Sequence, residues 1–241
     1  MKKRAILLAG GKGTRLKPYT ALIPKPLVPV GEKAILEILI ENLKKYGIMD
    51  ITICLNHLAE IIMAYFGNGK KYGVKISYTI EDKPLSTIAP LKLIPRLPEN
   101  FFVMNGDLLT DINFNDLFDY HISNKSIATV ATYKRKVKID FGVIEVCNKK
   151  NIATKFFEKP EYDFNVSMGV YVFNKKIMNY VPDNKSFGFD DLMLTLLKKN
   201  VKIKVYPYKG YWLDIGRPDD YEKAIEDVLK YEKIFDFGIN K

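Results

Sequence analysis

Three glycines and two cations lie together near the N-terminus of the chain. Gly10, Gly11 and Gly13 follow an apolar run of strand length, and Lys12 and Arg15 lie beside them. Glycine permits positive φ angles and close approach, so successive backbone N–H groups can point at phosphate oxygens. The segment therefore predicts a site for a polyphosphate, and in particular for a nucleoside triphosphate.

A third cation, Lys25, follows between Pro24 and Pro26. The two prolines stiffen the segment around the ammonium group and reduce the entropy that it loses on binding. The glycine run alone is weak evidence for a phosphate site, because it lacks the Gly-Lys-Ser/Thr ending of a Walker loop and the third glycine of a Rossmann fingerprint. A tight structural turn with Arg15 at the surface is the alternative that the glycines alone leave open.

Length and composition predict one domain, residues 1–241. The chain has 241 residues, of which 47% are hydrophobic, and it contains no internal repeat or evident linker. Its formal charge is +10 and its pI is near 9.3. The lysines are scattered along the chain rather than gathered into one basic block, which favours a solvated surface over a nucleic-acid or membrane partner.

The cysteines and the N-terminus predict the compartment. Cys54 and Cys147 lie in apolar, strand-like runs without metal-ligand spacing, which predicts buried free thiols in a reducing environment. The apolar run after the basic first residues is too short for a signal peptide or a membrane span. We therefore expect a cytoplasmic protein.

Hydrophobic periodicity predicts alternating strands and helices in the first half, about residues 1–115. The expected strands are Ala5 to Ala9, Ile51 to Leu55, Val74 to Ile80 and Phe101 to Met104, and the expected helices are Ile35 to Tyr46, Leu58 to Phe66 and Pro90 to Leu97. This alternation favours a doubly wound, mainly parallel α/β sheet with helices on both faces. Because ligands of such sheets bind beyond the carboxyl ends of the strands, the glycine turn and Asn105-Gly106-Asp107 should face one crevice.

The second half, about residues 116–241, is richer in strands. The expected strands are Ile127 to Tyr133, Phe141 to Val146, Ala153 to Phe157, Met168 to Asn174 and Ile203 to Tyr208, and the expected helices are Phe189 to Lys198 and Asp219 to Tyr231. We expect this half to extend the same sheet and to fold a small, sugar-sized lobe against it.

Five motifs in order give the chain a specific resemblance. They are residues 8–16 with 24–30, the turn 105–107, the strand 141–144, the segment 157–160 and the segment 212–216. Together they resemble the signature of the sugar-1-phosphate nucleotidylyltransferases, closest in pattern to the mannose-1-phosphate guanylyltransferases. The resemblance implies a Rossmann-like, GT-A-like fold and an enzyme that condenses a nucleoside triphosphate with a sugar 1-phosphate, giving an NDP-sugar for surface polysaccharide or glycoconjugate synthesis and pyrophosphate.

The resemblance also implies a role for each matched residue. Catalysis would rest on Arg15, Lys25 and Asp107, and Mg²⁺ would be held by Asp107 and Asp214. The nucleotide would be bound by Leu8, Ala9, Gly10, Gly11, Gly13, Thr14, Arg15, Lys25, Pro84, Thr87, Ala89 and Gly106. The sugar phosphate would be bound by Gly142, Glu158, Lys159, Met168 and Gly169.

Two segments depart from the family pattern, so the substrate pair stays open. Ser86 and Ala89 replace two glycines of the base-reading loop, and Val166-Ser167-Met168-Gly169 stands where relatives often have Asn-Ala-Gly. The loop lacks the glutamine that thymidylyl- and uridylyl-transferring relatives usually carry, which favours GTP. The sugar could be mannose, glucose, a heptose or an amino sugar. A thymidylyl-, uridylyl- or cytidylyltransferase, a catalytically weak paralogue, and a homodimer or larger homo-oligomer are also left open.

Overall fold

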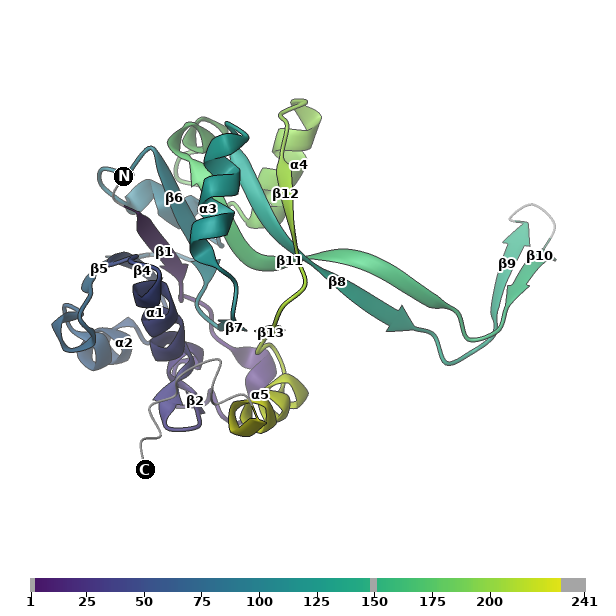
Figure 1. Ribbon diagram of the computed structural model, residues 1–241, viewed down its shortest axis with the longest axis horizontal. Helices are drawn as coiled ribbons and strands as arrows, with labels where there is room; N and C mark the ends of the chain where they lie inside the picture. The colour runs from purple at the N-terminus through teal and green to yellow at the C-terminus, as the bar shows by residue number, and fades with distance from the viewer. Residues whose placement is uncertain (1–2, 148–150, 231–241) are drawn as a thin grey trace.

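A mixed seven-stranded sheet forms the centre of the protein. The computed structural model describes residues 3–147 and 151–230. The order of the strands is β12-β8-β11-β6-β1-β4-β5 (Figure 1). The strands are β1 (Arg4–Leu8), β4 (Asp50–Leu55), β5 (Lys75–Ile80), β6 (Asn100–Asn105), β8 (Ala128–Lys138), β11 (Glu161–Asn174) and β12 (Lys204–Tyr208). Strands β6, β1, β4 and β5 are parallel, β11 is antiparallel to both β6 and β8, and β12 is parallel to β8.

Helices cover both faces of this sheet, which confirms the predicted α/β class. Alternate residues of β1 point to opposite faces. Ala5 and Leu7 join a core cluster with α1 (Ile35–Lys45), α2 (Ala59–Phe66) and α3 (Phe114–Ser123). Ile6 joins a second cluster with α4 (Phe189–Lys198) and the 3₁₀ helix η4 (Ala89–Leu93). The first strand is therefore buried on both sides, as expected for a central parallel strand.

A third, smaller cluster holds the C-terminal helix α5 (Pro218–Lys230) beside the sheet. Tyr221, Ala224 and Val228 of this helix pack with the hairpin of β2 (Pro29–Val30) and β3 (Lys33–Ala34) and with the pair of β7 (Leu108–Thr110) and β13 (Trp212–Asp214). The expected helix Asp219 to Tyr231 is found, although Tyr231 itself lies outside the described residues.

Helix α3 has no counterpart among the sequence predictions, and the helix expected over Pro90 to Leu97 is a shorter 3₁₀ helix, η4. At the start of α3 the side chain of Asn113 accepts hydrogen bonds from the backbone N–H groups of Asn115 and Asp116. This is the pattern of an N-cap, and it satisfies two of the donors that a helix N-terminus leaves free.

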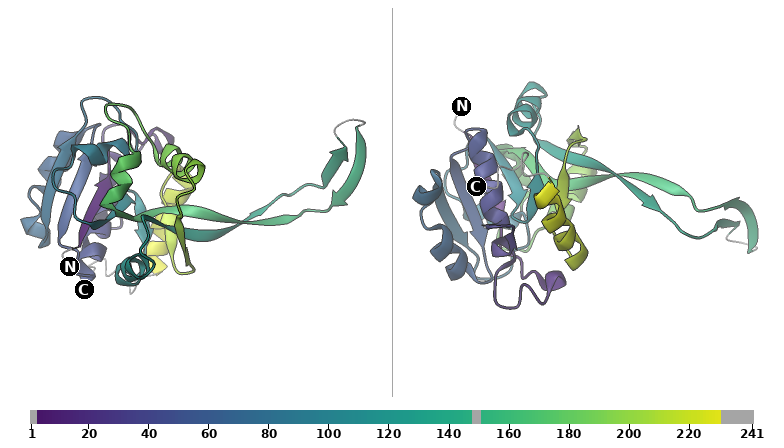
Figure 2. Two further views of the ribbon diagram at one scale, coloured as in Figure 1. Left: turned by 90° about the horizontal axis from the view of Figure 1, so that it is seen from above. Right: turned by 60° about the horizontal axis from the view of Figure 1, so that its bottom comes forward.

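Residues 134–147 and 151–165 form a long two-stranded arm, in place of a lobe folded against the sheet. Figures 1 and 2 show β8 and β11 continuing out of the sheet, with the hairpin of β9 (Val143–Cys147) and β10 (Ile152–Phe157) at the far end. Both long strands are buried within the sheet and exposed beyond residues 133 and 166. The expected strands are present, but β8 and β11 are longer than the sequence predicted.

The arm also corrects the prediction for one cysteine. Cys54 is buried on β4, as expected, whereas Cys147 is exposed at the end of β9. The alternation of apolar residues around Cys147 is that of a half-buried strand, but in a single chain the hairpin has no core to face. Both thiols are free.

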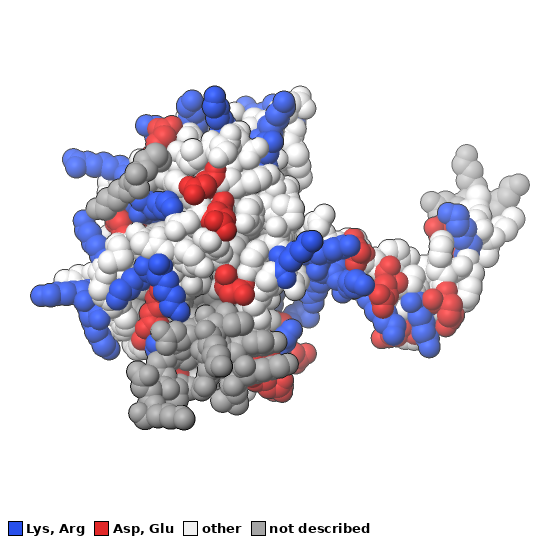
Figure 3. All heavy atoms as spheres, viewed as in Figure 1, with Lys and Arg blue, Asp and Glu red and all other residues white. Residues whose placement is uncertain are grey.

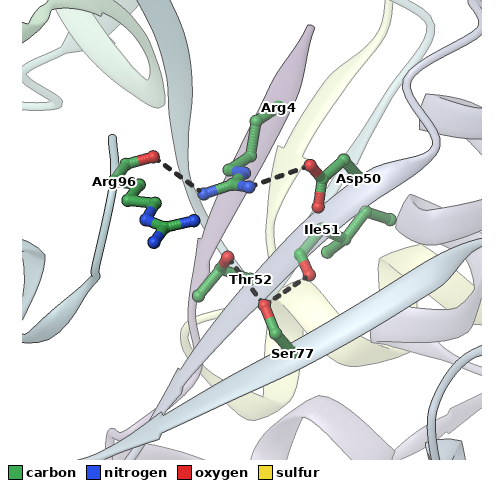
Figure 4. A network of polar contacts seen from close by, with 6 residues as sticks. All are labelled: Arg4, Asp50, Ile51, Thr52, Ser77 and Arg96. Carbon is green, nitrogen blue, oxygen red and sulfur yellow. Dashed lines mark hydrogen bonds and ion pairs between the residues drawn. The ribbon is translucent and has the colours of Figure 1, made fainter. Parts of the chain in front are cut away.

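The amino ends of the strands are joined by a polar network at the edge opposite the glycine turn. Arg4 of β1 donates to the Asp50 carboxylate (2.9 Å) and to the backbone oxygen of Arg96 (3.4 Å). Thr52 and Ser77 connect β4 to β5 through their hydroxyl groups (3.0 Å; Figure 4). These contacts connect the strands near their amino ends and leave the carboxyl ends open.

Basic and acidic side chains are mixed over the surface. Figure 3 shows Lys and Arg dispersed over the body, and both signs of charge alternating along the arm. Among the described residues, no helix combines the length and the apolar character needed to span a bilayer.

Candidate active site

A cavity of about 550 Å³ opens at the carboxyl ends of the parallel strands, where doubly wound sheets hold their ligands. Each of its segments follows one of the strands β1, β4, β5 or β6, apart from the Lys25-Pro26 turn. The lining residues are Leu8, Ala9, Gly10, Gly11, Lys12, Lys25, Pro26, Cys54, Asn56, Glu81, Pro84, Ser86, Thr87, Pro90, Asn105, Gly106 and Asp107. The structure therefore brings together the glycine turn, Lys25 and Asp107, as the sequence predicted.

The glycine turn is packed against the segment that carries Lys25. Gly13 has φ +61°, and a Cβ there would lie 3.0 Å from the Cβ of Lys25 and from Cγ2 of Thr20. The Thr20 hydroxyl donates to the backbone oxygen of Gly13 (2.8 Å). Gly13 and the neighbouring Thr14 do not line the cavity; they shape the turn that presents Gly10 and Gly11 to it.

Lys25 and Asp107 form an ion pair inside the cavity. The Lys25 ammonium donates to Oδ2 of Asp107, and the lysine is only 9% exposed. Lys25 begins the 3₁₀ helix η2 (Lys25–Leu27), whose first residue is positioned by Pro24 and Pro26. The other oxygen of Asp107, Oδ1, is buried and has no hydrogen-bond partner among the residues that the structure describes. A buried carboxylate oxygen without a partner is costly, so this atom is suited to a ligand.

Asp214 reaches the same place from the far end of the sequence. Strand β13 pairs antiparallel with β7, so that Asp214 lies opposite Leu108, and the backbone N–H of Ile215 donates to the Asp107 carbonyl (3.2 Å). Burial, and next the charge of Asp107, raise the pKa of Asp214 to about 6, while Lys25 and Arg15 oppose the shift. Arg15 therefore lies at the same site, although it does not line the cavity itself.

The two aspartates form a donor set suited to Mg²⁺. Two carboxylates with one buried oxygen left unpartnered match the way in which Mg²⁺ is bound through one or two carboxylates together with substrate phosphates and water. Within residues 3–147 and 151–230 there is no group of three or more His, Cys, Asp and Glu side chains that would form an all-protein cage.

The loop after β5 forms the wall of the cavity opposite the glycine turn. Ser86 takes φ +68°, so this serine keeps a backbone conformation that glycine adopts more readily. Pro84, Ser86 and Thr87 line the cavity, whereas Ile88 and Ala89 are turned into the core. Ala89 is therefore packed in the second core cluster and does not line the cavity.

The residues predicted for the sugar phosphate are divided between the body and the arm. Gly169, with φ +70°, packs against Asn105, and the buried Met168 accepts a hydrogen bond from the Trp212 indole through its carbonyl (2.9 Å). Both residues thus lie near the cavity. Gly142, Glu158 and Lys159 instead lie toward the far end of the arm and do not line the cavity.

Sequence reasoning did not assign roles to two polar residues of the cavity, Asn56 and Glu81. The Asn56 amide donates to the Glu81 carbonyl (3.2 Å), and one Glu81 carboxylate oxygen accepts from the Leu85 N–H (2.8 Å). Burial raises the pKa of Glu81. The signal was present, because Asn56 and Glu81 directly follow the ends of β4 and β5, where ligand-binding side chains of such sheets lie.

Comparison with known proteins agrees with this geometry. The nucleotidyl transferase family model matches residues 4–231. A UTP–glucose-1-phosphate uridylyltransferase of Synechocystis sp. is 32% identical, with 95% of this chain and 64% of that protein covered. The mannose-1-phosphate guanylyltransferase catalytic subunit beta of Dictyostelium discoideum is 33% identical, with 90% of this chain and 62% of that protein covered. The chain spans less than two thirds of the length of these curated relatives.

A solved structure shows the same architecture. HddC from Yersinia pseudotuberculosis, complexed with GMP-PN, superposes with a TM-score of 0.70 at 27% identity, covering 93% of this chain and 98% of that chain. Because the family model covers almost all of the described chain and the cavity is built from the matching motifs, the chain belongs to the nucleotidyl transferase family.

Proposed function

We propose that the protein transfers a nucleotidyl group from a nucleoside triphosphate to a sugar 1-phosphate and releases pyrophosphate. The observation that carries this proposal is the cavity in which the glycine turn meets the Lys25–Asp107 pair, with Asp214 beside Asp107. This set of backbone donors, cations and carboxylates can hold a triphosphate and neutralise charge around its α-phosphorus. The relatives whose names denote this activity support the assignment.

The reaction needs positioning more than proton transfer. A phosphate monoester has its second pKa near 6, so a sugar 1-phosphate is mostly a dianion at neutral pH and attacks without a general base. Its oxygen forms a bond to the α-phosphorus while the bond to the bridging oxygen of the β-phosphate breaks, and pyrophosphate leaves with that oxygen. Lys25 neutralises charge at the α-phosphate and Arg15 at the departing pyrophosphate.

Asp107 and Asp214 are the residues that would hold Mg²⁺. When bound, the ion would supply charge neutralisation at the phosphate oxygens. Asp214→Asn removes one carboxylate from the pair and should abolish Mg²⁺-dependent turnover without loss of the fold, which circular dichroism checks. Asp219→Asn, at an exposed carboxylate on the first turn of α5, is the matched control and should retain turnover. Near-normal rates in Asp214→Asn would contradict the metal assignment.

GTP is the triphosphate that the cavity favours. The Glu81 carboxylate lines the cavity. One of its oxygens accepts a hydrogen bond from the Leu85 N–H, so the other oxygen is available to accept a hydrogen bond from a base. Guanine offers adjacent N–H donors on its Watson–Crick edge, whereas uracil and thymine offer a single donor between two acceptors. The GMP-PN bound by HddC is consistent with this choice. Mannose 1-phosphate or a related hexose, heptose or amino-sugar 1-phosphate is the proposed second substrate.

A pyrophosphate-release assay tests the proposal. GTP, UTP, dTTP and CTP would each be combined with mannose 1-phosphate, glucose 1-phosphate and glucosamine 1-phosphate in the presence of Mg²⁺. We expect the highest kcat/KM with GTP, and a lower preference for GTP in Glu81→Gln. A preference for UTP with glucose 1-phosphate would favour the second candidate, which the Synechocystis relative suggests. The absence of pyrophosphate in every combination would refute the enzyme assignment.

A further inference from the structure

The arm is a continuous extension of the central sheet rather than a loose loop. Cross-strand pairing runs without interruption from Ser167 opposite Thr132 to Glu161 opposite Lys138. Ion pairs such as Lys134–Asp163 (2.6 Å) and Lys155–Glu145 (3.0 Å) connect neighbouring strands along it. The paired strands therefore extend from the body as one continuous ladder.

The base of the arm lies next to the candidate active site. Tyr133, the last residue of β8 before its exposed part, packs against Trp212 with ring centroids 5.4 Å apart, and Trp212 begins the strand that ends at Asp214. From Tyr133 to the end of β8 at Lys138 the strand advances five residues, which at roughly 3.3 Å per residue is about 17 Å, and Gly142 lies beyond that end. The arm leaves the body near the site and carries its far end away from it in all three views (Figures 1 and 2).

Four residues toward the far end form what we call the arm cluster: Gly142, Phe156, Glu158 and Lys159. A Cβ on Gly142 would lie 2.6 Å from the Phe156 ring and 3.4 Å from a Glu158 carboxylate oxygen, so these three residues are in close contact. Lys159 follows with φ +44°. A carboxylate to accept from hydroxyl groups, an aromatic ring and an ammonium group for a phosphate form a set suited to a sugar phosphate.

The same part of the arm exposes apolar side chains that a single chain leaves uncovered. Phe141 is 77% exposed and Phe156 is 62% exposed. Other exposed apolar residues of the hairpin are Ile144, Val146, Ile152 and Phe157. Apolar residues gathered on one small element in this way mark a surface that is covered by a partner.

We propose that two copies of the chain exchange arms, so that the arm cluster of each copy completes the cavity of the other. This inference rests on the proposed function for the role of Lys159. The partner is a second copy of this chain, because the arm cluster is suited to a sugar phosphate and the nucleotide with which that sugar phosphate reacts would bind in a cavity like the one described above. A two-fold exchange is self-complementary and completes both cavities at once, as in other swaps of an identical element.

Complementation between two inactive variants tests the exchange. Asp107→Asn disables the cavity and Lys159→Ala disables the arm cluster, so each homodimer should be inactive. In a mixed dimer formed by co-expression, the intact arm of the first variant would enter the intact cavity of the second. Random assortment of equal amounts should then restore about a quarter of wild-type turnover. Turnover no higher than that of the separate variants would overturn the exchange.

A second measurement does not depend on activity. Dimers assembled from ¹⁴N- and ¹⁵N-labelled chains would be treated with a lysine-specific cross-linker and analysed by mass spectrometry. We expect mixed-isotope links between Lys155 or Lys159 of the arm and Lys12 of the cavity. Links confined to one isotope, or a wild-type mass of one chain, would overturn the exchange even if the enzyme is active. Conversely, mixed-isotope links in a protein inactive on every substrate pair would refute only the proposed function.

A surface variant distinguishes docking through the arm from nonspecific self-association. Phe141→Ser removes the most exposed aromatic of the hairpin and should shift the sedimentation equilibrium toward one chain. Leu194→Ser, at a 67% exposed position on α4, is the matched control and should leave the mass unchanged. Equal masses for the wild type and Phe141→Ser would contradict docking through this face.

Discussion

At the scale of single residues, the candidate active site depends on charges that are only partly balanced. Lys25 is buried and paired with one oxygen of Asp107, while the other oxygen has no partner and the pKa of Asp214 is raised by burial and by Asp107. Holding two carboxylates together costs stability unless a cation compensates them. This partial balance of charge fits the proposed role of the site in binding phosphates and a metal ion.

Lys25→Ala should lower kcat about 100-fold or more with little effect on the KM for the sugar phosphate, because its ammonium group acts on the α-phosphate during the reaction. Steady-state pyrophosphate release with each substrate varied in turn checks this. Lys12→Ala, at an exposed lysine of the same cavity, is the control and should cost much less. A larger change in the sugar-phosphate KM than in kcat would contradict the role given to Lys25.

Gly13→Ala should destabilise the protein by about 2 kcal/mol, because alanine is disfavoured at φ +61° and its methyl group would press on Lys25 and Thr20. Urea unfolding measures the loss. Gly11→Ala provides a neighbouring comparison, since its φ is not positive and nothing lies within 4 Å of the added Cβ. Equal unfolding free energies for the two variants would show that the turn tolerates a side chain at Gly13.

The positions of the charged residues of the site could be predicted from the sequence better than the orientation of the loop residues around the cavity. Asp107 belongs to a turn that follows the end of β6, and Lys25 is positioned by its two flanking prolines at the start of η2. The orientation of Ala89 could not be predicted, because it depends on how Phe187 holds the loop: the Phe187 carbonyl accepts from the N–H groups of both Ile88 and Ala89 (3.0 Å each). That contact joins segments about a hundred residues apart.

At the scale of elements, helix α3, the arm and the short strands β2, β3, β7 and β13 separate the structure from the sequence prediction. Helix α3 was missed although its signal was present, because Phe114, Leu117 and Phe118 have helical spacing behind the N-cap Asn113. The arm was missed for a different reason. Strands that alternate apolar and polar residues look the same whether they pack on their own domain or on another copy, since periodicity reports one covered face and does not say what covers it.

Asn113→Ala should destabilise the protein by about 1 kcal/mol, because two backbone N–H groups at the start of α3 lose their acceptor. Chemical denaturation followed by circular dichroism checks this. Asn113→Asp retains an acceptor and should keep most of the stability. If both variants unfold at the same denaturant concentration, the cap contributes nothing of its own.

At the scale of the whole molecule, α3 is joined to the sheet by a buried histidine. His121 is 1% exposed; its Nε2 donates to Oδ1 of Asn100 on β6 (3.1 Å), and its Nδ1 pairs with the Thr129 hydroxyl of β8 (2.8 Å). Asn174 of β11 donates to the same Asn100 oxygen (3.0 Å). A neutral imidazole satisfies this network with one donor and one acceptor.

The contribution of His121 to the stability of the protein should therefore fall as the pH falls. Burial lowers the pKa of His121 from 6.5 to about 4 in the folded state, so below pH 6.5 the unfolded chain binds a proton that the folded chain excludes. Stability is complete above the unfolded pKa and is lost progressively down to the folded one. Between pH 7.5 and pH 5 the loss that arises from His121 should be about 2 kcal/mol, while Asp214, whose pKa is raised by burial, contributes in the opposite direction.

Urea unfolding at the two pH values measures this loss. His121→Gln has no group that titrates there, so its free energy of unfolding should change between the two pH values by about 2 kcal/mol less than that of the wild type. His57→Gln changes the other histidine, which lies outside this network, and should keep the wild-type pH dependence. If His121→Gln lost stability as steeply as the wild type, the titrating group would lie elsewhere, and the contact between α3 and the sheet would be independent of pH.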